Sequence, residues 1–332
     1  MDGNNLLVSK KSTRVFSMDL IRTISILLII GSHVLGTGNM FYQLLFGFNV
    51  PCMVLISGYV ANRDTCDSVI GYYKKRFSRI VLPSWGYFAL YFALVVVVAK
   101  ITGGGYPYSP KQILMTFLFL DGIGYTWILA VFVMIAAIIP VIKLVYKKYK
   151  NGLALWMIVY LIAALIMFFT PNDTITEKIL LYILSYLFLA TVGFCFEEVK
   201  KSKVCVGIGF GVMLMLVAYV LVTDRFAIWD ISINKYPPTI YYVMYGILIF
   251  YLLDVLCGLI SNPKKNKAIY NIILYVSKYS FDIYLWHIFA LYITNSIVTP
   301  WIRLPIVYAL SFILSWLYRV VINNIKSLAC KR

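Results

Sequence analysis

Long apolar runs recur along the whole chain, and they limit its possible folds more than any other feature. At 1.5 Å per residue, a helix needs about 20 residues to cross a bilayer core of about 30 Å. Ten runs meet that length or come close to it: residues 17–37, 40–61, 80–99, 125–146, 152–169, 178–197, 203–222, 236–260, 279–298 and 302–324. We therefore predict an all-α fold, a polytopic integral membrane bundle of about ten transmembrane helices.

The segments between these runs are short. An apolar piece at Ile113–Leu120 is too short to cross a bilayer, and we predict a re-entrant or interfacial helix there. The longest interruptions, residues 62–78 and 99–125, are too short to bury a core of their own. The prediction is therefore a single membrane-embedded domain over residues 1–332, with no separate soluble domain.

The basic residues divide the loops into two classes. The chain has 30 Lys and Arg against 13 Asp and Glu, a net charge of +17. With the N-terminus inside, 22 of the basic residues fall on cytoplasmic segments and six on outer ones. Because Lys and Arg collect on the cytoplasmic side, this predicts a multi-pass protein of the cell (inner or cytoplasmic) membrane with both termini in the cytoplasm. The same asymmetry explains the charge without a nucleic-acid partner.

The first apolar run carries three ionisable side chains, Asp19, Arg22 and His33. Such groups are costly inside a bilayer and are candidates for a functional site. Arg22 and His33 lie on nearly the same helix face, roughly 16 Å apart along the axis. Asp19 precedes Arg22 by one turn and could pair with it. Structural alternatives stay open, because Arg22 could snorkel to the membrane surface and His33 could join two helices.

Two other places in the chain could carry chemistry. The only other histidine, His287, lies with Asp282 in the predicted ninth span, where it could also be a buried structural residue. Arg76 and Arg79 are three residues apart in a basic segment and could hold phosphates, although such segments are usually topology signals. Asp19 or Asp282 could orient a histidine or balance Arg22.

Histidine chemistry alone leaves two classes of function open. A histidine can take a proton from a hydroxyl near neutral pH, as acyl or glycosyl transfer requires. A transporter or flippase for an envelope glycan precursor would use the same property in a proton relay. The six cysteines have no metal-ligand spacing, so we expect no metal site.

Several motifs occur together in a recognisable order. They are Met18–Arg22 followed by His33, Pro51 with Ser57–Tyr59, Lys75–Pro83, Tyr125–Leu129 and Ser280–His287. In this order the chain resembles acyltransferase family 3 over nearly its whole length. The ten residues between Arg22 and His33 and the arginine-rich stretch ending in Pro83 are the most specific of these motifs.

The resemblance implies a bacterial membrane O-acyltransferase, in most members an O-acetyltransferase that modifies cell-surface polysaccharides. It implies acetyl-CoA as the acyl donor, and a polysaccharide or lipid-linked glycan as the acceptor. By the same resemblance, Arg22 and His33 are the essential pair, and Arg76 and Arg79 are candidates for donor binding. Tyr125 and Trp127 match a further family segment. The resemblance is compatible with a homo-oligomer or with a glycan-assembly partner.

Overall fold

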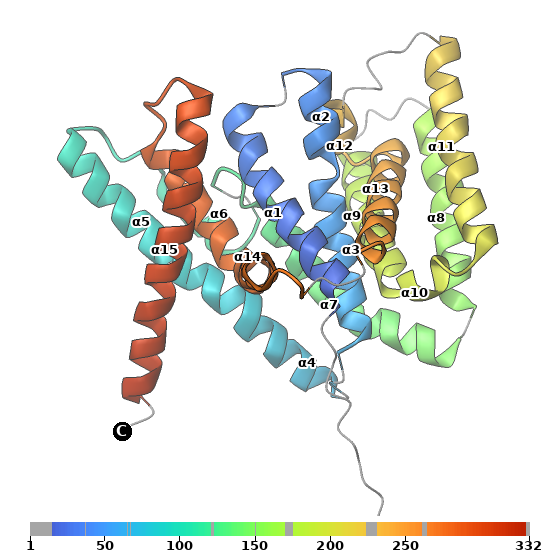
Figure 1. Ribbon diagram of the computed structural model, residues 1–332, viewed down its shortest axis with the longest axis horizontal. Coiled ribbons are helices and arrows are strands. Elements are labelled where there is room, and N and C mark those ends of the chain that lie inside the picture. Colours follow the sequence, from blue (N-terminus) through green and yellow to red (C-terminus); the bar gives the residue numbers. More distant parts are fainter. Residues whose placement is uncertain are drawn as a thin grey trace, which may run out of the picture.

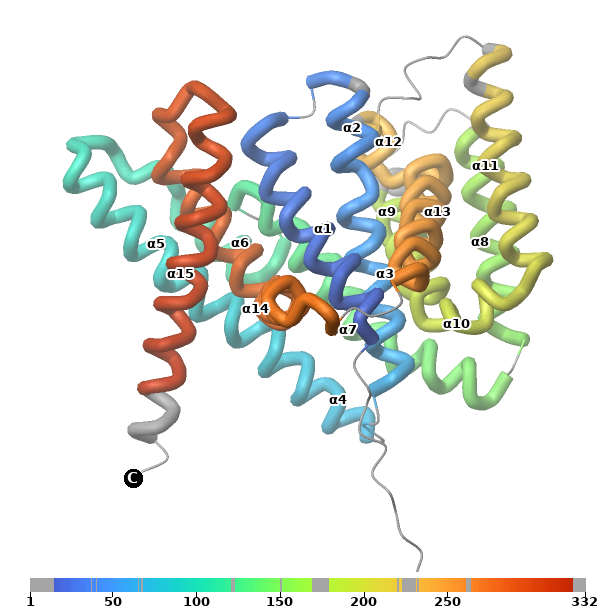
Figure 2. Tube along the Cα trace, viewed as in Figure 1, coloured from blue at the N-terminus to red at the C-terminus, as the bar shows by residue number. Residues whose placement is uncertain are grey.

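The computed structural model describes residues 15–36, 38–64, 66, 68–120, 123–149, 151–169, 175–223, 231–260 and 264–329 (Figures 1 and 2). Every regular element within them is a helix, as predicted. In chain order these are α1 (Phe16–Leu35), α2 (Met40–Gly47), α3 (Asn49–Asn62), α4 (Val69–Arg76), a π-helical turn (Phe77–Val81), α5 (Leu82–Thr102), α6 (Pro110–Phe117), α7 (Trp127–Lys148), α8 (Gly152–Phe169), α9 (Ile175–Phe194), α10 (Phe196–Val199), α11 (Lys203–Thr223), α12 (Ile231–Lys235), α13 (Ile240–Gly258), α14 (Lys267–Ile293) and α15 (Pro300–Ala329).

The number of membrane spans differs from the prediction. In the described part of the chain, six helices are long and apolar enough to cross a membrane: Phe16–Leu35, Phe41–Asn62, Val69–Thr102, Trp127–Lys148, Ile240–Gly258 and Pro300–Asn324. Helices α8, α9 and α11 contribute shorter apolar stretches, and α14, which carries Lys278 and Asp282, is not among the six. The helical membrane fold is confirmed, whereas the count of about ten spans is not.

The second predicted span has a one-residue interruption at Phe48, which divides the membrane-length helix Phe41–Asn62 into α2 and α3. Helix α2 ends at Gly47 and α3 begins at Asn49. Pro51 has no amide hydrogen and cannot donate to the carbonyl four residues earlier, so the helix is weakened at this point. The Asn49 side-chain amide donates to the Phe46 carbonyl at 2.8 Å. Asn49 is 1 % exposed and thus lies in the interior.

The apolar piece predicted at Ile113–Leu120 overlaps α6 (Pro110–Phe117). This helix has eight residues and cannot cross a bilayer. Ser109 and Gln112 form a capping box at its start. The Trp85 indole donates to the Phe117 carbonyl at 2.9 Å and fixes the end of α6 to α5.

Helix α1 lies at the centre of the bundle. It contacts α3, α13, α14 and α15. Figure 1 shows α14 nearly end-on beside α1, with α15 to the left of α14. Helices α8 and α11 lie at the right edge of the same view. The ionisable residues of α1 are therefore surrounded by other helices rather than by lipid alone.

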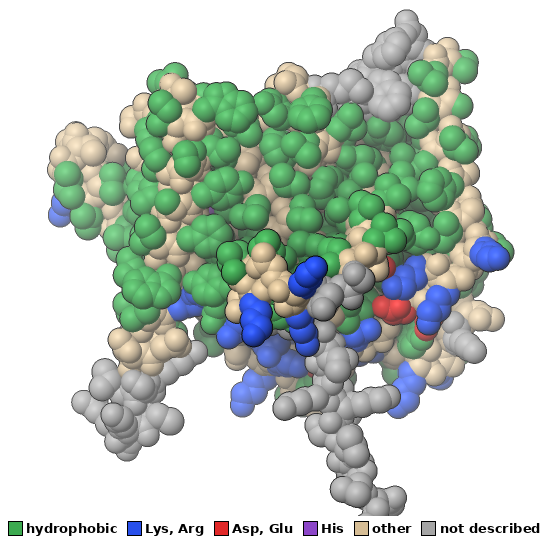
Figure 3. Space-filling model, viewed as in Figure 1, with side chains coloured by type: hydrophobic (Ala, Val, Ile, Leu, Met, Phe, Trp, Pro, Cys, Tyr) green, Lys and Arg blue, Asp and Glu red, His purple; other side chains and the backbone are tan. Residues whose placement is uncertain are grey.

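Charged side chains gather at one end of the molecule, and apolar side chains cover most of the rest of the face in Figure 3. The described ion pairs at this end include Asp64 with Lys75 at 2.6 Å, and Lys200 with Asp254 at 3.1 Å. Ser17, at the start of α1, donates to Asp254 at 2.9 Å. Helix α1 begins and α15 ends toward this basic end.

Candidate active site

His33 lies in the last turn of α1, which ends two residues later, before Gly36. Gly36 has a φ of 74°, a conformation that glycine adopts without a steric penalty. The His33 ring stacks on the Tyr125 ring with 3.4 Å between ring centres. The His287 ring is 5.4 Å from His33 and nearly parallel to it. Three candidates that are far apart in the sequence thus lie together.

His287 is fully buried in α14 and has a defined tautomer. Its Nδ1 contacts the backbone carbonyl of Tyr284. Because a carbonyl only accepts hydrogen bonds, Nδ1 carries the proton and donates it. Nε2 therefore holds a lone pair, and this atom is buried with no hydrogen-bond partner among the described residues. The structure places a second proton acceptor beside His33.

The turn that precedes α7 is held against α14. The Tyr284 hydroxyl donates to the Tyr125 carbonyl. Gly124 has a φ of 54°, so the chain reverses there in the left-handed region that glycine tolerates. Tyr284 was not predicted as a site residue, and it fixes the backbone that presents Tyr125 to His33.

A small pocket lies beside His33. Six helices contribute to its wall, which is lined by Ile29, Ser32, His33, Phe46, Asn49, Val50, Trp127, Ile128, Lys235 and Tyr284. Trp127 was predicted as a candidate, whereas Lys235 and Asn49 were not. Lys235 could have been noticed in the sequence, because the positive-inside rule gives a reason for lysines on the cytoplasmic side but none for a lysine on an outer segment.

The other ionisable candidates have partners outside this cluster. Asp19 is buried and accepts a hydrogen bond from the Ser277 hydroxyl of α14 at 2.5 Å. Arg22 is half-buried on α1. Asp282 lies 3.8 Å from Arg319 of α15, which gives it a partner other than those expected.

The basic segment is helical rather than a loop, and Asp64 anchors it. Asp64, with its side chain 5 % exposed, lies 2.6 Å from the Lys75 ammonium and 3.8 Å from Arg76. Lys143 of α7 donates to the Asp64 carbonyl at 2.8 Å. Arg79, in the π-helical turn, is exposed. A wide π turn changes the direction of successive side chains, so Arg76 and Arg79 differ in exposure although they are three residues apart.

The contacts of Asp64 with the basic segment stabilise its negative charge. Burial alone would raise the pKa of the Asp64 carboxyl, but the hydrogen bond and the charge of Lys75 outweigh it, with smaller contributions from the Cys66 amide and Arg76. The net result is a lowered pKa. Asp64 is therefore ionised at neutral pH and holds Arg76 at the basic end of the bundle.

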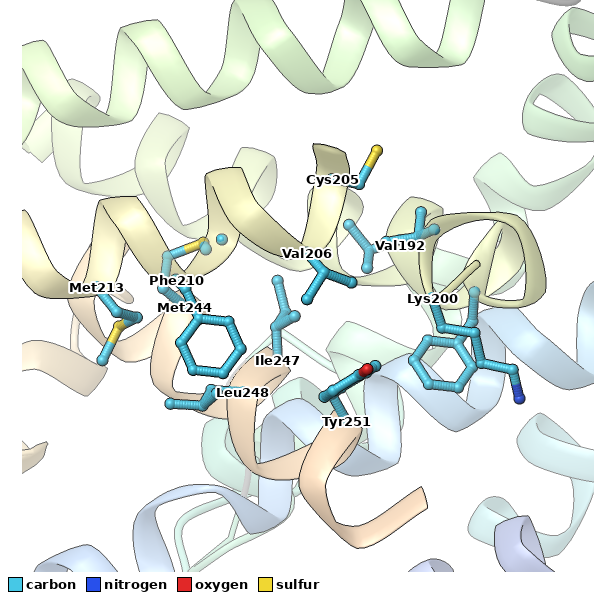
Figure 4. Close-up of a pocket in the computed structure, with 13 residues that line it drawn as sticks. Val192, Lys200, Cys205, Val206, Phe210, Met213, Met244, Ile247, Leu248 and Tyr251 are labelled. Atoms are coloured by element: carbon cyan, nitrogen blue, oxygen red, sulfur yellow. The ribbon is translucent and has the colours of Figure 1, made fainter. Parts of the chain in front are cut away.

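A second hollow lies between α11 and α13 and is almost entirely apolar (Figure 4). The one charged side chain on its wall, Lys200, points to the rim and pairs with Asp254 and Glu197. Within the described residues, no group of three His, Cys, Asp or Glu side chains could hold a metal ion. The polar groups suited to acid–base chemistry are those around His33.

Comparison with protein-family models gives a match over most of the chain. The acyltransferase 3 family model, described as an acyltransferase domain, matches residues 15–320. The matched stretch includes both histidines, the basic segment and Lys235. Neither the curated proteins nor the solved structures contain a significant match.

Proposed function

Since the chain belongs to acyltransferase family 3 and is a membrane acyltransferase, we propose that it is an O-acetyltransferase. Its donor is acetyl-CoA, and its acceptor is a hydroxyl of a cell-surface polysaccharide or of the lipid-linked precursor. The observation that carries this proposal is the cluster of His33, His287 and Tyr125 beside a pocket. A pocket with a histidine on its wall can bring a hydroxyl to a base.

The transfer step needs one base. The acceptor oxygen attacks the thioester carbonyl, a carbon–oxygen bond forms, and the carbon–sulfur bond breaks. His33 takes the proton from the hydroxyl and returns it to the CoA sulfur, so CoA leaves as the thiol. His287 lies one ring away, and its Nε2 has no hydrogen-bond partner in the described part of the chain.

The two ends of α1 suit the two substrates. By the positive-inside rule we place the basic end, and with it both termini, in the cytoplasm, where acetyl-CoA is found. Arg79, which is exposed, and Arg76, which is held by Asp64, are suited to the CoA phosphates. A guanidinium group can donate two parallel hydrogen bonds to the oxygens of one phosphate. We assign Arg22, one or two turns into the membrane, to the donor side. His33, at the other end of α1, meets the acceptor.

This assignment predicts an effect of Asp64→Asn on donor use. Without the carboxylate, Lys75 and Arg76 lose the partner that positions them, and we expect the KM for acetyl-CoA to rise about threefold to tenfold while kcat changes little. Because the folded pKa of Asp64 is lowered, its contribution is present above the ordinary carboxyl pKa and is lost as the pH falls through the lowered value. Assays at neutral pH therefore see the full effect.

Asp254→Asn is the matched control for this variant. Asp254 also pairs with a lysine at the basic end, but it belongs to the cluster with Lys200 and Ser17. We expect it to leave the KM for acetyl-CoA unchanged. An equal rise in both variants would mean that the basic end as a whole, rather than the segment held by Asp64, responds to charge.

The function itself is tested by transfer of label. Membranes that contain the chain, and matched membranes that lack it, are incubated with acetyl-CoA labelled in the acetyl group. We expect alkali-labile label in membrane glycolipid or polysaccharide only when the chain is present, because an O-acetyl ester is cleaved by base. A transporter or flippase would move the glycan without forming this ester, so absence of label would contradict the proposal.

A further inference from the structure

Among the polar side chains on the wall of the pocket beside His33, Asn49 and Lys235 take no part in the transfer step. They come from α3 and α12, which are separated by about half of the chain. Both share the pocket wall with His33. They are therefore placed to recognise the acceptor.

Asn49 offers a buried acceptor atom. Its side chain is 1 % exposed, and its amide nitrogen is occupied by the Phe46 carbonyl. Its Oδ1 has no hydrogen-bond partner among the described residues. Buried polar atoms are nearly always satisfied in folded proteins, so this atom is available to accept a hydrogen bond from a group that enters beside it.

Lys235 offers a cation that is held by aromatic rings. Its ammonium lies 5.5 Å from the centre of the Trp127 ring and 5.2 Å from that of Tyr236. In the part of the chain that the structure describes, no carboxylate forms an ion pair with it. Burial lowers the pKa of the Lys235 ammonium to about 8, so the charge is present at neutral pH but is poorly compensated. An anion bound in the pocket would supply the missing partner.

From these groups we infer that the pocket is the acceptor subsite, and that Lys235 selects a sugar bearing a carboxylate or phosphate near the hydroxyl that is acylated. Asn49 accepts a hydrogen bond from another hydroxyl of the same sugar. Trp127, on the wall of the same pocket, offers an apolar ring to its C–H groups. The inference rests on the proposed function, because it names the acceptor class for that reaction.

Protection of Lys235 tests the inference without turnover. The purified protein is treated with the amine reagent N-hydroxysuccinimidyl propionate at pH 8, and the labelling rate of each lysine is followed by mass spectrometry. Glucuronate, glucose 6-phosphate or glucose is added at equal concentration and ionic strength. We expect the two anionic sugars to slow labelling of Lys235 at least about threefold more than glucose does, with exposed Lys111 as the internal control.

Equal labelling of Lys235 with all three sugars overturns the inference. Because the measurement needs no acyl transfer, it remains decisive if the donor is not acetyl-CoA. If acetyl transfer is observed and protection is not, the proposed function stands and the acceptor class is wrong.

Variants give an independent readout through acceptor preference. Octyl glucuronide and octyl glucoside differ only at the sixth carbon, and we expect the wild type to favour the glucuronide by roughly tenfold in kcat/KM. Lys235→Gln should remove this preference, Lys235→Arg should keep it, and Lys111→Gln should not change it. A Lys235→Gln protein that loses activity equally with both acceptors contradicts a role in selection.

Discussion

Replacing His33 with Ala is expected to slow acyl transfer by roughly 10²-fold to 10⁴-fold, the range attributed to a general base. His33 is the histidine on the pocket wall, and its ring is already held by stacking on Tyr125. Without it, the acceptor hydroxyl keeps its proton when it meets the thioester. The measurement is single-turnover transfer of label from acetyl-CoA in membranes with matched amounts of protein.

Ser25→Ala is the control for damage to α1. Ser25 is fully buried on the same helix, and its hydroxyl has no hydrogen-bond partner in the described part of the chain. We expect activity within about twofold of the wild type, because the change removes one buried oxygen and leaves the helix intact. If His33→Ala retained the wild-type rate, His33 would not be the base, and His287, with its lone pair on Nε2, would be the group to replace next.

The sequence identified the members of the histidine cluster but not their contacts. His33 and His287 were recognisable because an ionisable group within a predicted span is a candidate for a functional site, and Tyr125 was recognisable through the family resemblance. Their proximity depends on how α14 crosses α1 and on the turn held by Tyr284, and neither is encoded in local spacing. Lys235 was missed because it was treated only as one of the few cations on outer segments.

The fold was predictable where an apolar run alone defines the helix. The first predicted span, residues 17–37, agrees closely with α1. The ninth, residues 279–298, does not, because α14 already begins at Lys267 and includes polar residues. The polar residues before Tyr279, among them Lys267 and Lys278, lower the hydropathy without ending the helix. Hydropathy therefore marks the apolar part of α14 and not its full length.

The second large effect is expected at the crossing of α3 and α9, where Gly193→Ala should prevent close packing. A Cβ atom at Gly193 would lie 2.1 Å from the Leu55 carbonyl oxygen, and one at Gly58 would lie 2.0 Å from the Ala190 carbonyl oxygen. Both obstacles are backbone atoms, which cannot rotate away as a side chain could. The helices must separate along the whole contact, and we expect a loss of more than about 3 kcal/mol in the free energy of unfolding.

Gly207→Ala is the matched control, because Gly207 also lies inside a helix, α11, but a Cβ atom there would meet nothing within 4 Å. Alanine favours the helical backbone over glycine by about 0.5–1 kcal/mol, so this variant should be neutral or slightly stabilised. Thermal unfolding of the detergent-solubilised proteins, followed by loss of the monodisperse peak in size-exclusion chromatography, compares the two. Equal unfolding temperatures would show that α3 and α9 do not pack as closely as the structure places them. A selective loss for Gly193→Ala would instead establish that close backbone contact between α3 and α9 stabilises the bundle.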